Sequence, residues 1–119
     1  MRPEDGAMNN ADYPIPDVAD IRLTEIMRAL ADPGRLRMIE ILADGEYHPC
    51  NPEEFGLGVQ KSTLSHHFKT LREAGLTITR VQGRNKGIRL RRDDLERRFP
   101  GLIDALTSAS ALADLDRTG

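Results

Sequence analysis

The spacing of the hydrophobic residues changes at Gly75, and this change limits the folds that the chain can adopt. Before Gly75 the apolar side chains recur at i, i+4 and i+7, which predicts one amphipathic helix over residues 61–75. After it, residues 76–82 and 88–91 alternate apolar and polar side chains on either side of a turn segment at residues 83–87, which predicts a β-hairpin. The chain therefore leads from a helix directly into a hairpin.

The polar face of this helix has an unusual composition for a surface that only faces water. It holds few carboxylates and is rich in serine, threonine, histidine and lysine, whose side chains can donate hydrogen bonds to phosphate oxygens and base edges. We expect Ser62 to cap the start of the helix and Gly75 to end it in the left-handed conformation. His67 lies nearer the apolar side, so it is either a packing residue or a DNA contact.

The charges are distributed unevenly along the chain, although the net charge is only −2. Residues 1–60 hold 5 Lys and Arg against 12 Asp and Glu, whereas residues 61–98 hold 11 against 4. Residues 99–119 hold 1 against 3. A basic block inside an otherwise acidic chain is typical of a site for a polyanion, and this block begins at the unusual helix.

Three further helices are predicted before the helix at residues 61–75. The first is capped by Asp17 or Asp20. The second, over residues 34–43, follows Asp32-Pro33, which suits its cap and first position; it is apolar nearly all round, so we expect it to be the central helix. The third begins at the capping box of residues 51–54 and spans only one or two turns.

Two more helices, over residues 93–99 and 101–112, are predicted after the hairpin. The fold class is therefore mainly α with a small β-hairpin: a winged helix-turn-helix of five to six helices. We expect it to be dimeric, because so small a domain gains much by pairing with a copy of itself. In this fold the second helix of the motif enters the major groove of DNA. We place the DNA-binding and dimerisation domain at residues 19–113, after a disordered or loosely docked arm at 1–18 and before a flexible tail at 114–119.

DNA contacts are expected from the start and outer face of the predicted helix and from the tip of the hairpin. Hydroxyl groups and free backbone N–H groups at a helix start can hold phosphate, and basic side chains at the hairpin tip can contact flanking backbone. The candidate DNA-binding residues are Lys61, Ser62, Thr63, Ser65, His66, Lys69, Arg84 and Lys86. Four further arginines either add long-range attraction or form structural salt bridges: Arg80, Arg89, Arg91 and Arg92.

Length, composition and cysteine count narrow the class of protein. A chain of 119 residues suits one domain with a small core. It has no apolar run of the roughly 18 residues needed to span a membrane. With no signal-peptide pattern and a single cysteine, Cys50, we expect it in the cytoplasm. Its three histidines, one cysteine and scattered acids form no set of nucleophile, base and orienting group, so we expect no catalytic residues and no enzyme.

The chain resembles the ArsR/SmtB family of bacterial winged-helix repressors over roughly residues 20–106. The resemblance rests on three stretches: ALADPGRLRMIEILADG at 29–45, KSTLSHHFKTLREAGL at 61–76 and TRVQGRNKGIRL at 79–90. It implies a homodimer that binds a double-stranded DNA operator, represses transcription and leaves the DNA when an effector arrives. It also implies a dimer interface on the first and last helices, formed by Leu23, Ile26, Met27, Leu30, Leu102, Ile103 and Leu106.

Many members of that family bind metals through a Cys-x-Cys pair at the start of the first helix of the motif. At the matching place this chain has His48 and Cys50, separated by Pro49. Both side chains suit zinc, nickel or copper, but two ligands do not complete a site, and cysteine is more often a small buried residue. No metal site or required cofactor is therefore assigned, and the effector stays open between a metal, a redox signal, a small molecule and a partner protein.

One alternative function is a winged-helix protein-interaction subunit that relies on a partner protein to sense its signal. Such a module would carry an apolar or acidic recognition face, whereas the face at residues 61–75 is polar and basic. Repression and activation are not distinguished by the residues themselves.

Overall fold

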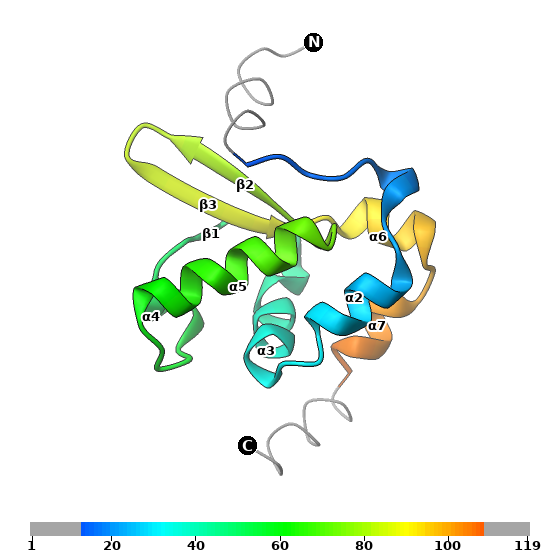
Figure 1. Cartoon of the computed structure of the whole chain (residues 1–119), viewed down its shortest axis with the longest axis horizontal. Coiled ribbons are helices and arrows are strands. Elements are labelled where there is room, and N and C mark those ends of the chain that lie inside the picture. The colour runs from blue at the N-terminus through cyan, green and yellow to red at the C-terminus, as the bar shows by residue number, and fades with distance from the viewer. Residues whose placement is uncertain (1–12, 109–119) are drawn as a thin grey trace.

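The computed structural model describes residues 13–108, which form six α-helices, two short 3-10 helices and a small sheet (Figure 1). The helices are α2 (Leu23–Ala29), α3 (Pro33–Ile41), α4 (Pro52–Phe55), α5 (Lys61–Glu73), α6 (Arg92–Arg98) and α7 (Leu102–Leu106), with 3-10 turns at Val18–Asp20 and Leu42–Asp44. The strands are β1 (His48–Pro49), β2 (Thr77–Gln82) and β3 (Asn85–Leu90). This is the predicted winged helix-turn-helix.

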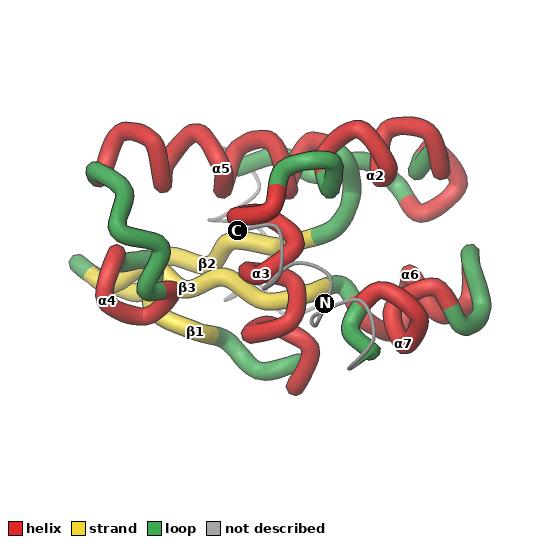
Figure 2. The backbone as a smooth tube through the Cα atoms, turned by 90° about the horizontal axis from the view of Figure 1, so that it is seen from below, coloured by secondary structure: helices red, strands yellow, loops and turns green. Residues whose placement is uncertain are grey.

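The sheet is antiparallel with the strand order β1-β3-β2. Figure 2 shows α5 and α2 along one side of the molecule and the strands on the other, with α3 in the middle and α6 and α7 beyond the end of the sheet. The hairpin of β2 and β3 extends away from α6 and α7. Its tip and the start of α5, the second helix of the motif and hence the recognition helix, both lie at the end of the molecule where α4 is found (Figure 1).

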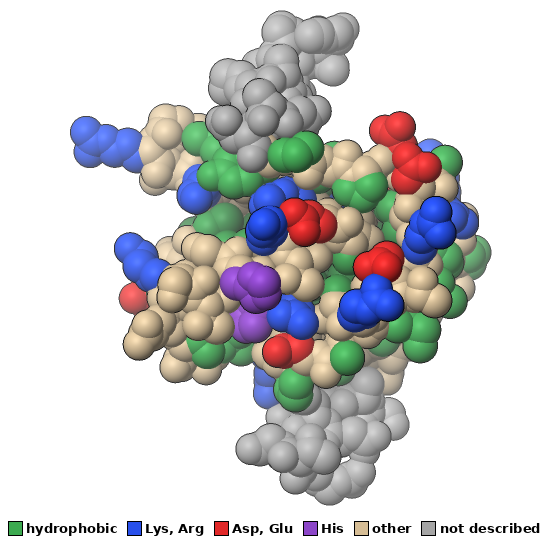
Figure 3. Space-filling model, in the orientation of Figure 1, with side chains coloured by type: hydrophobic (Ala, Val, Ile, Leu, Met, Phe, Trp, Pro, Cys, Tyr) green, Lys and Arg blue, Asp and Glu red, His purple; other side chains and the backbone are tan. Residues whose placement is uncertain are grey.

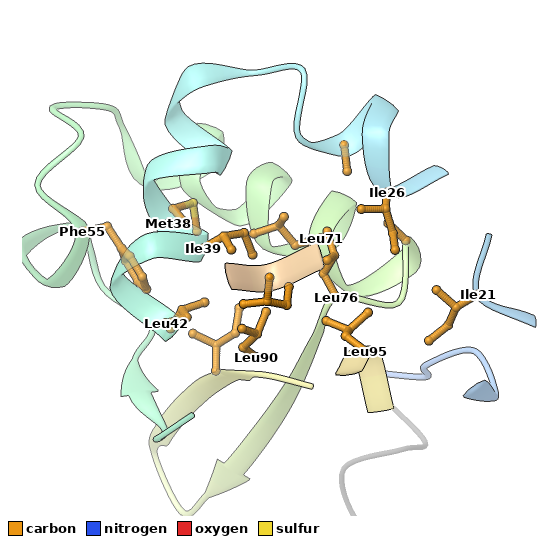
Figure 4. Packing of buried hydrophobic residues seen from close by; sticks show 14 of the residues in the cluster. Ile21, Ile26, Met38, Ile39, Leu42, Phe55, Leu71, Leu76, Leu90 and Leu95 are labelled. Carbon is orange, nitrogen blue, oxygen red and sulfur yellow. The ribbon is translucent and has the colours of Figure 1, made fainter. Parts of the chain in front are cut away.

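The core lies between α3, α5 and the sheet (Figure 4). The predicted central position of α3 is confirmed, because Met38 and Ile39 are fully buried, as is Leu42 directly after the helix. Side chains from every other layer converge on them, among them Ile21, Ile26, Leu71, Leu76, Leu90 and Leu95. In the part of the chain that the structure describes, no helix has the length and apolar character needed to cross a membrane.

Two of the predicted helix caps are confirmed and two are wrong. Asp32 Oδ1 accepts from the backbone N–H groups of Gly34 (2.7 Å) and Arg35 (3.1 Å), and Asn51 Oδ1 accepts from that of Glu54 (2.9 Å). Ser62 is not a cap: α5 begins at Lys61 because the extended backbone ends at Gln60, which places Ser62 within the first turn. The helix α2 begins only at Leu23, after an extended Arg22, so neither Asp17 nor Asp20 caps it.

The end of α5 confirms the role predicted for Gly75. Its φ is 90°, and the N–H groups of Gly75 and Leu76 donate to the carbonyls of Arg72 and Leu71, both at 3.0 Å. This pair of bonds is the Schellman arrangement that ends a helix through a left-handed residue. Ile21 packs directly on the glycine, because a Cβ built at Gly75 would lie 2.7 Å from Ile21 Cγ1.

The hairpin is confirmed, but its turn is shorter than predicted. Gln82 pairs with Asn85, so only Gly83 and Arg84 form the turn, and Gly83 supplies the positive φ of 62° that such a tight connection needs at its first position. The strand β1 was not predicted. It pairs only His48 with Ile88 and Pro49 with Gly87, and two residues are too few for an alternating pattern.

The last part of the segment predicted as an arm lies against α6. Arg91 Nη1 donates to the carbonyl of Pro16 at 2.8 Å, and Arg98 Nε donates to that of Val18 at 3.1 Å. Arg91 is only 5% exposed and also forms an ion pair with Asp94 at 3.1 Å, so its role is structural. Residues 1–12 and 109–119 lie outside the described residues, as do the predicted tail and the last turns of the terminal helix.

Candidate nucleic-acid interface

The polar face of α5 is an exposed surface, as the helical spacing predicts. Leu64 and Leu71 are buried against the core, whereas the predicted contact residues of the helix are all exposed: Lys61, Ser62, Thr63, Ser65, His66 and Lys69. Figure 3 shows basic side chains and histidine gathered over α5 and at the end of the hairpin, on the same face of the molecule. An ion pair of 4.0 Å between Lys69 and Glu73 is the only one formed by a predicted contact residue within residues 13–108.

The two predicted hairpin contacts differ in their surroundings. Arg84 is exposed in the turn itself. Lys86, one residue into β3, is also exposed, but its Nζ donates to the hydroxyl of Tyr13 at 3.2 Å. Tyr13 was not among the predicted site residues, because 73 positions separate it from Lys86 and no local pattern links them.

His67 faces the interior, so its packing interpretation is the correct one. The side chain is 7% exposed, and Arg35 Nη1 lies 3.0 Å from its Nδ1. Because a guanidinium can only donate, Nδ1 accepts and the ring proton belongs on Nε2. Burial lowers the pKa of His67, and the charge of Arg35 acts in the same direction, so a neutral ring is favoured.

The remaining arginines of the basic block divide between aromatic stacking and salt bridges. The guanidinium carbons of Arg80 and Arg89 lie 3.8 Å and 5.0 Å from the centroid of the Tyr47 ring. Neither arginine forms an ion pair with a carboxylate of residues 13–108. Arg92 forms an ion pair with Asp104 at 3.1 Å, which supports the structural interpretation for that residue.

Of the two side chains considered as metal ligands, His48 is engaged by carboxylates and Cys50 is a partly buried free thiol. His48 Nδ1 lies 2.5 Å from Glu54 Oε2, and its Nε2 lies 3.0 Å from Asp44, so both ring nitrogens are engaged. Burial raises the pKa of the Cys50 thiol to about 11, which disfavours the thiolate that a metal needs. Among the described residues, no group of three or more His, Cys, Asp and Glu side chains is arranged to hold a metal ion.

Six of the seven residues predicted to form a dimer interface, all except Ile103, line an open apolar groove between α2 and α7. Leu23 is 42% exposed and Met27 is 62% exposed, which is unusual for large apolar side chains. The groove encloses about 330 Å³ and is lined by Leu23, Ile26, Met27, Leu30, Leu102 and Leu106. Ile26 and Ile103 are each only 1% exposed, so they belong to the core of this chain rather than to its surface.

The sequence of this chain is similar to those of known proteins. The family model described as "Bacterial regulatory protein, arsR family" matches residues 32–78, from the cap of α3 to the start of the hairpin. The protein named "Uncharacterized HTH-type transcriptional regulator YceK" of Bacillus subtilis (strain 168) is 41% identical over 83 residues, which cover 69% of this chain and 83% of that protein.

Two further relatives carry names that state a regulatory role. The HTH-type transcriptional regulator CmtR of Mycobacterium tuberculosis (strain ATCC 25618 / H37Rv) is 32% identical over 92 residues, or 76% of this chain and 75% of that protein. The arsenical resistance operon repressor of Staphylococcus xylosus is 34% identical over 74 residues, or 62% of this chain and 70% of the repressor. The present chain is thus a winged helix-turn-helix transcriptional regulator, and it belongs to the arsR family of bacterial regulatory proteins.

Proposed function

We propose that this regulator binds an operator as a homodimer, represses transcription there, and leaves the DNA when an effector arrives. The observation that carries the proposal is the exposed polar face of α5, which has basic hairpin residues beside it and only one carboxylate, that of Glu73. In the dimer, two copies of α5 enter successive major grooves, about 34 Å apart. Such a role would be carried out at the chromosome, in the cytoplasm.

The apolar groove between α2 and α7 supports the homodimer. Met27 and Leu23 expose apolar surface that does not stabilise an isolated chain, and a second copy would remove this surface from water. In a two-fold symmetric dimer, the groove of one copy would pack against the groove of the other, and both copies would use the same residues. We therefore assign to the interface the exposed Leu23 and Met27 together with the half-buried members of the predicted set, Leu30, Leu102 and Leu106.

The role as a DNA-binding repressor is tested by measuring affinity for the protein's own promoter DNA across a salt series. Each phosphate neutralised by a basic side chain contributes about −0.9 to the slope of log affinity against log salt, so binding should weaken steeply as salt rises. Lys69→Ala should lower affinity and flatten the slope by about 0.9 for each copy of the contact. Release of the DNA is then followed by adding candidate effectors to the preformed complex.

A matched control is Arg97→Ala on α6. The side chain of Arg97 is 72% exposed, and its partner Asp94 would still form the ion pair with Arg91. The substitution therefore removes one positive charge at a place away from α5 and the hairpin. Its affinity and salt slope should stay close to those of the unsubstituted protein. Equal losses in both variants would indicate nonspecific attraction, and the absence of binding to any duplex would refute the proposed function.

A further inference from the structure

Tyr13 joins two cations that belong to different parts of the DNA-facing surface. Lys86 Nζ donates to the Tyr13 hydroxyl at 3.2 Å and lies 5.3 Å from the centroid of the Tyr13 ring. The guanidinium carbon of Arg72, on the last turn of α5, lies 5.2 Å from the same centroid. One tyrosine therefore connects the end of the recognition helix to the hairpin.

The position of Tyr13 is held by contacts further along its own segment. Three residues later, the carbonyl of Pro16 accepts from Arg91 Nη1 at 2.8 Å, and Arg91 is buried and paired with Asp94. The carbonyl of Val18 accepts from Arg98 Nε at 3.1 Å. The hydrogen bonds to this backbone therefore fix the segment that follows Tyr13 and keep its side chain close to the two cations.

The three side chains keep hydrogen-bond donors and positive charge available. Within residues 13–108, neither Arg72 nor Lys86 forms an ion pair with a carboxylate, so both keep their full positive charge. The Tyr13 hydroxyl accepts from Lys86 and so retains its own proton for donation; accepting from a cation makes it a stronger donor. Two unneutralised cations thus lie beside one tyrosine, Lys86 at its hydroxyl and Arg72 at its ring, and together with the hydroxyl donor they suit a phosphate oxygen.

We propose that Tyr13, Arg72 and Lys86 form one binding site for a backbone phosphate of DNA, located between the recognition helix and the hairpin. The inference rests on the proposed function and adds Tyr13 and Arg72 to its contacts. Tyr13 contributes a neutral hydrogen bond and holds Lys86 in place, whereas the two cations contribute charge. These contributions respond differently to salt, which makes them separable.

The test uses the full chain and operator DNA from its own promoter. Tyr13→Phe removes the hydroxyl and keeps the ring, so affinity should fall about fivefold or more at fixed salt while the salt slope stays unchanged. Arg72→Ala and Lys86→Met should instead flatten the slope. When Lys86→Met is already present, Tyr13→Phe should cost little more, because the two residues act on one phosphate.

The control is Tyr47→Phe, the same chemical change at the only other tyrosine of the chain. Tyr47 stacks with Arg80 and Arg89 and should leave DNA affinity unaltered. A scan with methylphosphonate, which replaces charged phosphates by neutral groups at the same position of both half-sites, should find one position at which Tyr13→Phe and the unsubstituted protein bind equally well.

Several outcomes would overturn the inference. If the unsubstituted protein binds its operator and Tyr13→Phe binds as tightly, the phosphate site is refuted and the proposed function stands. If no duplex is bound at all, both fall together. If inorganic phosphate binds the DNA-free protein at submillimolar concentration and this binding is lost in Tyr13→Phe, the site belongs to a free anion and the assignment to DNA is wrong.

Discussion

Replacing Gly75 by alanine should destabilise the protein by about 2–5 kcal/mol through two separate effects. A residue with a Cβ held at φ 90° pays about 1–2 kcal/mol in backbone conformation. The new methyl group would also lie 2.7 Å from Ile21 Cγ1 and 3.0 Å from its Cδ1, and overpacking of this kind costs about 1–3 kcal/mol. Against a total stability of about 5–15 kcal/mol, the loss is large enough to measure and need not unfold the chain.

Gly45→Ala provides a matched control for the backbone effect alone. Gly45 has a φ of 80°, close to that of Gly75, but a Cβ there would meet nothing within 4 Å. It should therefore lose only about 1–2 kcal/mol. The difference between the two variants measures the collision with Ile21. In an Ile21→Ala background, where that side chain is absent, Gly75→Ala should cost no more than Gly45→Ala.

The assay is urea denaturation followed by far-ultraviolet circular dichroism. All variants must be compared at one protein concentration, because the apparent stability of a protein that dimerises rises with the logarithm of its concentration. Equal losses for Gly75→Ala and Gly45→Ala would refute the packing argument. A cost at Gly75 that persists in the Ile21→Ala background would show that the strain arises from the backbone and not from the contact.

Three further perturbations test other parts of the structure. Burial would lower the pKa of His48, but its hydrogen bonds to Glu54 and Asp44 outweigh burial and raise that pKa. The stability that protonated His48 contributes is therefore complete below pH 6.5 and is lost as the pH rises through the folded-state pKa. His48→Gln should flatten this part of the profile of urea midpoint against pH. Asp32→Ala removes both cap bonds of α3 and should cost about 1 kcal/mol in urea denaturation, while a wild-type midpoint would show that the cap is dispensable. Leu106→Asp places a charge in the apolar groove and should yield monomers in sedimentation velocity; an unchanged sedimentation coefficient would count against that interface.

The parts of the fold that depend on local patterns were predictable from the sequence. The apolar spacing of α5, the cap at Asp32 and the left-handed end at Gly75 each involve residues within a few positions of one another, and all three are confirmed. The error at Ser62 is of one or two positions, because serine, threonine and glutamine at the start of α5 offer several starting points with similar local energy.

The contacts that the sequence did not reveal join distant positions. Tyr13 reaches Lys86 across 73 positions, and buried Arg91 reaches the carbonyl of Pro16 across 75. A carbonyl acceptor carries no side-chain signature, so no sequence pattern marks the partner of Arg91. The engagement of His48 by Asp44 and Glu54 was hidden for a different reason, because the same histidine also fits a metal-binding pattern.

The contacts of Arg35 affect how strictly a dimer would select the spacing between the two half-sites of an operator. Its Nε donates to the carbonyl of Ala29 at 2.6 Å, at the end of α2, while its Nη1 reaches His67 on α5 at 3.0 Å. One guanidinium thus contacts both the helix assigned to dimerisation and the helix assigned to DNA, and it helps to hold the angle between them. Each α5 of a dimer lies roughly 17 Å from the symmetry axis, half of the ~34 Å between half-sites, so a tilt of about 5° in both copies changes the distance between them by about 3 Å, nearly one base-pair step. Loosening Arg35 would therefore broaden the range of half-site spacings that a dimer accepts, even where its stability is hardly altered.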